Sequence, residues 1–281
     1  MTRVLLIGGS GRLGTAIRQR WSDCEIAAPP HRELDIADAA ALCEALKALR
    51  PDVLVNAAAF HDVDRCEDEP QEAFAINAAA VGAAARAAHD RGIIFATVST
   101  DYVFDGDATE PYGEDCPPHP ISFYGVSKLA GELLVESLRT RAYVVRTCGL
   151  YGEASSRRRP SLIERVLERN PGEAPLRVVA DVVASPSFAG DVADALRQLI
   201  ATESFGLYHA VNCEPVSWYD FACEVARQAG IAIPIEPISA AQWKQRAARP
   251  RYSALRNAKL DALGIAMPSW KAGIAAYLRS P

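Results

Sequence analysis

The sequence predicts an α/β protein in which a parallel β-sheet is covered by helices on both faces and is followed by a smaller C-terminal lobe. Short apolar runs alternate with helical patterns through the first half of the 281 residues, and a glycine-rich turn follows the first run. After about residue 150, prolines become frequent and the alternation is lost. Strands that are apolar on both faces are typical of parallel sheets, and right-handed β-α-β connections arrange such sheets as a doubly wound, Rossmann-type fold.

The first half contains five expected strands and four expected helices. The strands are compact apolar runs at residues 3–7, 24–28, 53–55, 93–98 and 142–146. The helical patterns lie at residues 15–21, 38–49, 72–90 and 123–138. Asp38 is a candidate N-cap of the second helix, which Pro51 stops, and Gly92 ends the third helix.

The second half is expected to form most of a separate lobe. Prolines at 160, 171, 175, 186, 215, 234 and 237 interrupt it. A helix at 191–201 and a strand at 207–211 are expected to return to the main sheet. We therefore expect a Rossmann domain over 1–150, joined by residues of about 188–212, and a substrate-binding lobe in 151–281.

Composition disfavours nucleic acid and membranes as partners. The net charge is -5, and the densest basic cluster is only Arg157, Arg158 and Arg159. A duplex-binding surface needs a wider basic footprint. No apolar run approaches the roughly 20 residues that span a bilayer, and the N-terminus lacks the pattern of a signal peptide.

Cysteine and histidine spacing gives no support for a structural metal or a disulfide framework. The seven cysteines include no Cys-x-x-Cys pair, and the five histidines include no His-x-x-x-His pair. We therefore expect no metal site, and thiols that stay reduced in a cytoplasm.

The glycine-rich turn predicts a dinucleotide cofactor. Gly8, Gly11 and Gly14 lie between an expected strand and an expected helix. Gly8 allows the tight turn, Gly11 lets the backbone approach a pyrophosphate, and Gly14 lets the helix pack closely on the strand. The helix N-terminus offers N–H groups to the phosphates. A tight turn in another α/β protein is the alternative.

The segment after the second strand favours NADPH over NADH. An acidic residue that would bind the ribose hydroxyls of NADH is missing until Glu33. Arg32 and His31 are placed to meet a 2′-phosphate, and Arg12 within the glycine turn adds to them. Asp35 and Ile36 are expected beside the adenine, with a helix N-cap region as the alternative for that pair.

Tyr124 and Lys128 predict proton transfer in an oxidoreductase. They are four residues apart in an expected helix, so they share one face. A free tyrosine titrates near ~10, and a nearby Lys⁺ together with the positive charge of a cofactor would lower that value. Ser99 and Thr100 end the fourth strand, where ligands of open α/β sheets collect, and Thr100 is placed to orient a carbonyl against Tyr124. A solvated helix face is the alternative for the Tyr-Lys pair alone.

Nearly the whole chain resembles an extended short-chain dehydrogenase/reductase, and within that group the RmlD-like dTDP-4-dehydrorhamnose reductase family. Ser99-Thr-Asp-Tyr-Val-Phe-Asp-Gly106 and Ser217-Trp-Tyr-Asp-Phe-Ala222 are the most specific matches. The other matching segments are 8–14, 34–38, 55–59, 63–67, 124–132, 146–147, 151–152, 206–209 and 249–255.

The resemblance implies hydride transfer from a nicotinamide to the C4 ketone of a nucleotide-linked 4-keto-6-deoxy sugar, with Tyr124 as the proton donor. It places Thr100, Tyr124 and Lys128 in the catalytic set and Asp101 near the sugar. Its cofactor residues are Gly11, Arg12 and Leu13 on the pyrophosphate, Asp35 and Ile36 on the adenine, and Ala57, Ala58, Ala59 and Val98 along the cofactor.

Three segments on the substrate side depart from the family pattern. Gly149 stands where the family has a tryptophan that packs on the sugar nucleotide, and segments 159–162 and 181–187 have lost family motifs. We therefore expect the substrate to be either a nucleotide-linked 4-keto-6-deoxy sugar or a related ketone.

The sequence leaves two other functions open. One is a cofactor-binding regulatory subunit, as in the regulatory subunit of methionine adenosyltransferase. The other is a nucleotide-sugar epimerase or dehydratase. It also leaves open whether the chain forms a homodimer.

Overall fold

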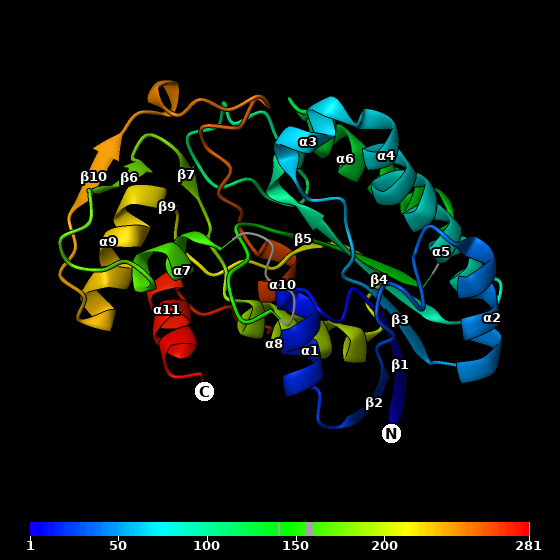
Figure 1. The fold of residues 1–281 in the computed structure, drawn as a ribbon. Helices are drawn as coiled ribbons and strands as arrows, with labels where there is room; N and C mark the ends of the chain where they lie inside the picture. Colours follow the sequence, from blue (N-terminus) through cyan, green and yellow to red (C-terminus); the bar gives the residue numbers. More distant parts are fainter. Residues whose placement is uncertain (140, 155–159, 281) are drawn as a thin grey trace.

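A computed structural model describes residues 1–139, 141–154 and 160–280, so the Arg157–Arg159 cluster lies outside the described residues. Its centre is a six-stranded parallel sheet in the order β2-β1-β3-β4-β5-β8 (Figure 1). The strands are β1 (Thr2–Ile7), β2 (Cys24–Ala27), β3 (Val53–Asn56), β4 (Ile94–Thr100), β5 (Ala142–Thr147) and β8 (Gly206–His209). The predicted α/β fold with a doubly wound parallel sheet is confirmed.

The strand order places a switch point between β1 and β3. The chain runs from β1 outward to β2, then returns and adds β3, β4 and β5 on the other side. Ile7 at the end of β1 lies in register with Asn56 at the end of β3. Ligands of open α/β sheets bind outside the carboxyl ends of the strands at such a point.

Helices cover both faces of the sheet (Figure 1). One face packs on α1 (Arg12–Arg20) and α8 (Ala189–Thr202), and the other on α2 (Ala39–Leu49), α5 (Val81–His89) and α6 (Phe123–Ser137). Successive residues of a strand point to opposite faces, so Leu5 packs with the second layer and Leu6 with the first. Asp38 caps α2 as expected, since its side chain accepts a hydrogen bond from the Ala41 N–H.

The expected helix at 72–90 is three helical segments. They are α4 (Pro70–Phe74), the π-helix η1 (Ala75–Ala80) and α5. The side chain of Asn77 in η1 bonds the backbone of Phe60 through both its oxygen and its nitrogen, at 2.9 Å each. This tertiary contact leaves no mark on local periodicity, so the sequence predicted one regular helix.

The C-terminal lobe is built on two small sheets, one pairing β6 (Leu176–Val179) with β10 (Ile235–Ile238) and the other β7 (Val183–Ala184) with β9 (Val216–Ser217). Its core gathers Phe221, Val225 and Trp270. The remaining elements of the chain are α3 (Val63–Asp68), η2 (Asp101–Val103), α7 (Leu162–Leu167), α9 (Trp218–Ala229), η3 (Ala240–Gln242), α10 (Ala258–Ala262) and α11 (Trp270–Leu278). Residues around α10 pack against the central six-stranded sheet. Leu260 and Met267 belong to the same hydrophobic core as α1 and α8 on one face of that sheet.

All seven cysteines are free thiols. Across the described residues, no helix is both long and apolar enough to cross a membrane. The same residues contain no group of three or more His, Cys, Asp or Glu side chains arranged to hold a metal ion.

Candidate active site

The glycine turn is shaped by backbone contacts that exclude side chains at two of its three glycines. Gly8 has φ +82°, and a Cβ there would lie 2.6 Å from the Ala58 nitrogen. A Cβ on Gly14 would lie 2.2 Å from the Gly8 carbonyl oxygen. A Cβ on Gly11 would meet only that same oxygen, at 3.5 Å. Gly8 and Gly14 therefore pack the turn, whereas Gly11 faces open space.

The first turn of α1 fits a phosphate group. Gly11 is its N-cap and supplies no side chain to the free N–H groups, which together with the helix dipole attract anions. Leu13 is buried in the core beside the sheet. The Arg12 guanidinium pairs with Glu164 of α7 at 2.7 Å, so this predicted cofactor residue also joins the sheet domain to the lobe.

The loop after β2 presents its basic side chains to solvent. Arg32 and His31 are 84% and 83% exposed, and their nearest carboxylates are Glu33 at 3.6 Å and Asp35 at 3.7 Å. Asp35 also accepts a hydrogen bond from the Ala37 N–H at 3.0 Å. Ile36 is buried among the residues between the sheet and α2. Arg32 and His31 are thus unconstrained enough to turn toward a phosphate.

Residues Ala57, Ala58 and Ala59 leave β3 directly beside the glycine turn. The Ala57 N–H donates to the Ile7 carbonyl at 2.9 Å. The buried Asn56 side chain accepts from the Ala58 N–H at 3.1 Å and donates to the Thr97 hydroxyl at 3.1 Å. The first of these bonds joins the loop after β3 to the end of β1, and Asn56 ties the same loop to β4.

Lys128 reaches from α6 to the end of β4. Its Nζ donates to the Val98 carbonyl oxygen at 2.7 Å, and the side chain is buried. Burial lowers the pKa of Lys128 to about 8, while the nearby Glu132 carboxylate works in the opposite direction.

Tyr124 lies on the same face of α6, and Thr100 is the last residue of β4. Burial raises the pKa of the Tyr124 phenol, and hydrogen bonding with Thr100 opposes that rise. The expectation that Lys128 and the positive charge of a bound cofactor together lower this pKa stays a prediction, since burial, Thr100 and Asp101 are the largest influences on the phenol here. The ammonium is directed to the Val98 carbonyl, and buried Asp101 raises the phenol's pKa further. A neutral phenol is the state that an acid catalyst needs before it donates its proton.

Asp101 belongs to a buried polar cluster next to the catalytic candidates. Its carboxyl accepts hydrogen bonds from the Thr100 hydroxyl and from the Cys148 thiol, both at 3.1 Å, and it also bonds the side chain of Ser253. Burial raises the pKa of Asp101. Cys148 and Ser253 had no assigned role in the sequence, because their proximity to Asp101 depends on the fold.

Gly149 borders an aromatic side chain of the lobe. It has φ +51°, and a Cβ there would lie 2.6 Å from Cη2 of Trp218. The edge of the Trp218 ring therefore takes the space where a side chain of residue 149 would begin.

Two buried contacts that no sequence pattern predicted hold α6 in place. Asn77 donates to the Ser127 hydroxyl at 3.0 Å, and Ser127 donates to the Tyr124 carbonyl at 2.8 Å. One turn beyond Lys128, Glu132 pairs with Arg146 of β5 through contacts of 2.6 to 3.2 Å. The spacing of Tyr124, Lys128 and Glu132, four residues apart on one helix face, is the signal from which Glu132 could have been found.

The chain matches known proteins over nearly its whole length. Residues 1–280 match the family described as RmlD substrate binding domain. A dTDP-4-dehydrorhamnose reductase of Streptomyces griseus is 36% identical, over 97% of this chain and 91% of the relative. The spore coat polysaccharide biosynthesis protein SpsK of Bacillus subtilis is 32% identical, over 99% of this chain and 98% of the relative.

A solved structure agrees with these sequence relationships. The crystal structure of dTDP-4-dehydrorhamnose reductase from Bacillus anthracis, in complex with NADP, aligns with a TM-score of 0.94 and 31% identity. The alignment covers 99% of this chain and 98% of that one. The resemblance inferred from the motifs is confirmed, and the chain belongs to the RmlD substrate-binding-domain family of the extended short-chain dehydrogenases/reductases.

Proposed function

We propose that the chain is an NADPH-dependent reductase of a nucleotide-linked 4-keto-6-deoxy sugar or a closely related ketone. The observation that carries the proposal is the convergence of Thr100, Tyr124 and Lys128 at the carboxyl edge of the sheet. The relatives named as dTDP-4-dehydrorhamnose reductases and the NADP complex of one of them support it.

The cofactor would lie across the switch point between β1 and β3. Gly8, Gly11 and Gly14 with the start of α1, including Arg12 and Leu13, would hold its pyrophosphate. Arg32 would bind the 2′-phosphate, with Asp35 and Ile36 beside the adenine. Ala57, Ala58, Ala59 and Val98 would line its path to Tyr124 and Lys128. The open face of Gly11, the uncapped helix and the exposed Arg32 support this arrangement with NADPH, and NADH remains the alternative cofactor.

When bound, NADPH supplies the hydride that reduces the ketone carbon. Tyr124 donates its phenolic proton to the developing alkoxide, so that the ketone becomes an alcohol and the phenol becomes a phenolate. The Thr100 hydroxyl, whose single proton is donated to Asp101 in the structure, would turn that proton to the carbonyl oxygen and so orient the ketone against Tyr124. Lys128, fixed by the Val98 carbonyl, would hold the nicotinamide ribose through its remaining N–H groups.

The substrate would lie between the sheet domain and the lobe. Thr100 and Asp101 would contact the sugar, and Gly149 would border the nucleotide. We assign residues 1–150, with about 188–212, to the cofactor-binding domain and most of 151–281 to the substrate lobe. The return of α8 and β8 to the central sheet supports this division.

We also propose that the chain forms a homodimer through the outer faces of α4, η1 and α6. Phe123, Val126 and Leu133 of α6 share one face and are 44%, 38% and 54% exposed. Leu133 also lines a groove of about 570 Å³ whose other lining residues include the small side chains of Ala78 and Ala130. Large side chains next to a small-residue groove are self-complementary across a two-fold axis. Light scattering should find a dimer, and Leu133→Arg a monomer; a monomeric wild type would contradict this.

The seven free thiols support the proposal that the enzyme works in a reducing compartment, the cytoplasm.

The function is tested by incubating the purified protein with NADPH and a dTDP-4-keto-6-deoxy sugar. A reductase oxidises one NADPH for each sugar that becomes a 4-hydroxy sugar. Conversion of the sugar without net oxidation of cofactor would indicate an epimerase or dehydratase instead. Tight NADPH binding with no conversion of any 4-keto sugar would favour a regulatory subunit.

A further inference from the structure

A basic groove lies at the amino edge of the sheet, at the opposite ends of the strands from the glycine turn and Tyr124. We call it the amino-edge groove. It has a volume of about 1030 Å³ and is lined by the beginnings of β1, β3 and β4 and by the ends of α2 and α8. Its size is at the upper end of the range for small-molecule sites, which is roughly 300–1,000 Å³.

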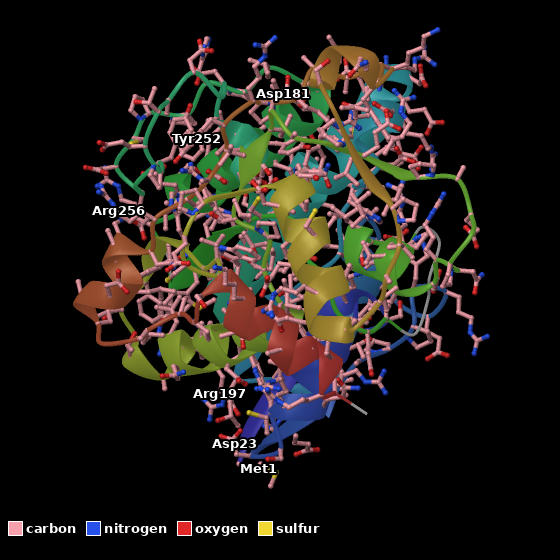
Figure 2. The ribbon with its side chains drawn as sticks, turned by 90° about the vertical axis from the view of Figure 1, so that its left-hand side faces the viewer. Met1, Asp23, Asp181, Arg197, Tyr252 and Arg256 are labelled. Carbon is pink, nitrogen blue, oxygen red and sulfur yellow. The ribbon has the colours of Figure 1, made fainter. Side chains whose placement is uncertain are left out.

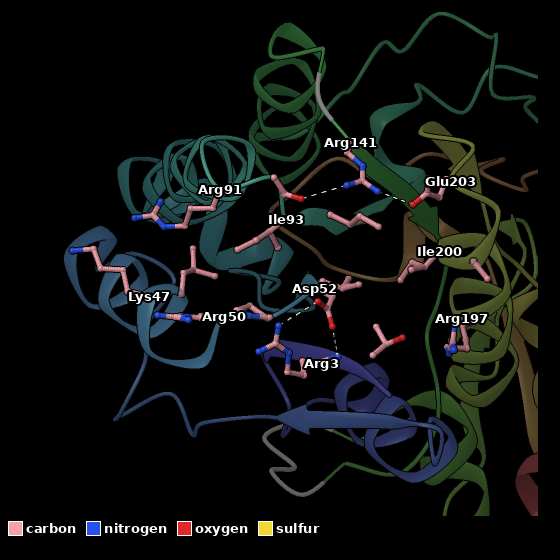
Figure 3. A pocket seen from close by; sticks show the side chains of 17 residues that line it. Arg3, Lys47, Arg50, Asp52, Arg91, Ile93, Arg141, Arg197, Ile200 and Glu203 are labelled. Carbon is pink, nitrogen blue, oxygen red and sulfur yellow. Dashed lines mark hydrogen bonds and ion pairs between the residues drawn. The ribbon is translucent and has the colours of Figure 1, made fainter.

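The charge of the amino-edge groove opposes the charge of the molecule. Two carboxylates line it, those of Asp52 and Glu203, in a chain whose net charge is -5. Its cationic side chains are Arg3, Lys47, Arg50, Arg91, Arg141 and Arg197. Figure 3 shows these side chains around the pocket on separate elements, with Lys47, Arg50 and Arg91 on one side and Arg141 and Arg197 on the other. Lys47 also pairs with Glu44, and Arg197 with Asp23, so the positive excess of the groove rests mainly on its other cations. A concave surface with an excess of positive charge concentrates anionic ligands.

Several of these cations are available to a ligand. Within 1–139, 141–154 and 160–280, Arg50 and Arg91 are in no ion pair. Arg3 pairs with Asp52 at 3.4 Å and Arg141 with Glu203 at 2.6 Å, but all four of these side chains are 46% to 61% exposed. Exposed ion pairs are worth little, so an incoming anion can replace the carboxylates.

The attraction of cations to the C-terminal ends of helices explains only some of the basic residues in the amino-edge groove. Lys47 lies in the last turn of α2 and Arg91 just beyond α5, where cations complement the helix dipole. Arg3 belongs to β1 and Arg141 precedes β5, so the same effect does not place them. Arg50 follows α2 in the left-handed conformation, with φ 44°. The fold therefore brings cations from strands and helices to one hollow.

We propose that the amino-edge groove binds an oligophosphate, a chain of two or more phosphates that is either free or carried by a nucleotide. Arginine guanidinium groups match phosphate oxygens with paired N–H donors. Cations spread around a groove suit an extended anion of several charges better than a single phosphate. In Figure 2, Met1, Asp23 and Arg197 lie at the end of the molecule remote from Asp181 and Tyr252 of the lobe. Because the groove lies at the amino edge of the sheet and the glycine turn at the carboxyl edge, the ligand would bind together with the cofactor and would not compete with it.

Calorimetric titration of the full chain with tripolyphosphate tests the proposal. NADPH is kept at a saturating concentration, so that it occupies the proposed cofactor site at the glycine turn throughout the titration. The affinity for NADPH is measured in a separate titration. We expect one site per chain at about 50 mM salt, and weaker binding at about 200 mM, because salt screens exposed charges. The double variant Arg50→Glu/Arg91→Glu should bind at least about ten-fold more weakly, since two attractions become repulsions.

Lys244→Glu/Lys271→Glu is the matched control, because it reverses two charges in the lobe, outside the groove. It should bind as the wild type does, and equal melting temperatures would show that both variants fold. If ATP and tripolyphosphate bind with equal affinity, the groove recognises the phosphate chain alone, and the ligand is a free oligophosphate. If ATP binds more tightly, the ligand is a nucleotide. Both results support the site. The proposal is overturned by no binding, by unchanged binding in the groove variant, by equally tight binding of inorganic phosphate, or by tighter binding of a DNA oligonucleotide.

Discussion

At the scale of single residues, Lys128 has the electrostatic property on which the proposed chemistry most depends. Its ammonium is buried against a backbone carbonyl, and burial lowers its pKa to about 8 from the ordinary 10.5. The group is therefore charged at neutral pH and loses its proton as the pH rises through about 8. A cofactor held by that ammonium should bind less well on the alkaline side.

We predict that the affinity for NADPH and kcat/KM both fall as the pH rises through about 8. Lys128→Arg keeps its charge at that pH and should move the falling limb to higher pH. Fluorescence titration of NADPH across the pH range measures the affinity directly. If the affinity for NADPH falls at the same pH in the wild type and in Lys128→Arg, a group other than Lys128 causes the pH dependence.

A second prediction at this scale contrasts two glycines of the same turn. In Gly14→Ala, the new Cβ would lie 2.2 Å from the Gly8 carbonyl oxygen. Because that oxygen belongs to the backbone, the clash can be relieved only by moving the turn. We expect a loss of about 1–3 kcal/mol in the free energy of unfolding. Gly11→Ala is the control, because its Cβ has only an ordinary contact at 3.5 Å. Urea unfolding that found Gly11→Ala as damaging as Gly14→Ala would refute this account of the turn.

At the scale of elements, α6 is held by buried polar contacts at both ends of its catalytic face. Asn77 of the π-helix bonds Ser127, next to Lys128, and Glu132 pairs with Arg146 one turn further on. The Glu132 and Arg146 side chains are only 5% and 3% exposed. A buried charge that loses its partner is costly, whereas a buried pair replaced as a whole often is not.

Glu132→Gln should therefore destabilise the protein by about 3–5 kcal/mol, because Arg146 stays charged and buried. It should also lower the pKa of Lys128, since Glu132 raises it, and so move the alkaline limb below about 8. Glu203→Gln, which breaks the exposed pair with Arg141, should cost less than about 1 kcal/mol. Similar losses in the two variants, measured by chemical unfolding, would argue against a structural role of the buried pair.

At the scale of the whole molecule, the sequence predicted what local patterns encode. The apolar runs and glycine positions predicted the strands, the helices and the turn at the carboxyl edge, and the spacing of Tyr124 and Lys128 predicted that they share one helix face. The π-helix around Asn77, the Glu132–Arg146 pair and the return of α10 to the sheet were not predicted. Each depends on residues that are distant in the chain, so no local pattern records them.

The same limit applies to the contacts between the two parts of the chain. The Arg12–Glu164 pair joins residues 152 positions apart, and Trp218 covers Gly149 from another element. The motif at residues 8–14 indicated a role for Arg12 at the phosphates but not its pairing with Glu164. It also did not indicate that Trp218 lies against Gly149. Both contacts depend on how segments distant in the chain pack together.

The measurement that tests the central claim most directly is turnover of a dTDP-4-keto-6-deoxy sugar with NADPH by wild type, Tyr124→Phe and Tyr219→Phe. Tyr219 is the control, a tyrosine of α9 in the lobe. Removing the proton donor should lower kcat by about 10²–10⁴-fold while NADPH still binds, and Tyr219→Phe should match the wild type. Tyr124→Phe that reduces the sugar at the wild-type rate would contradict the account.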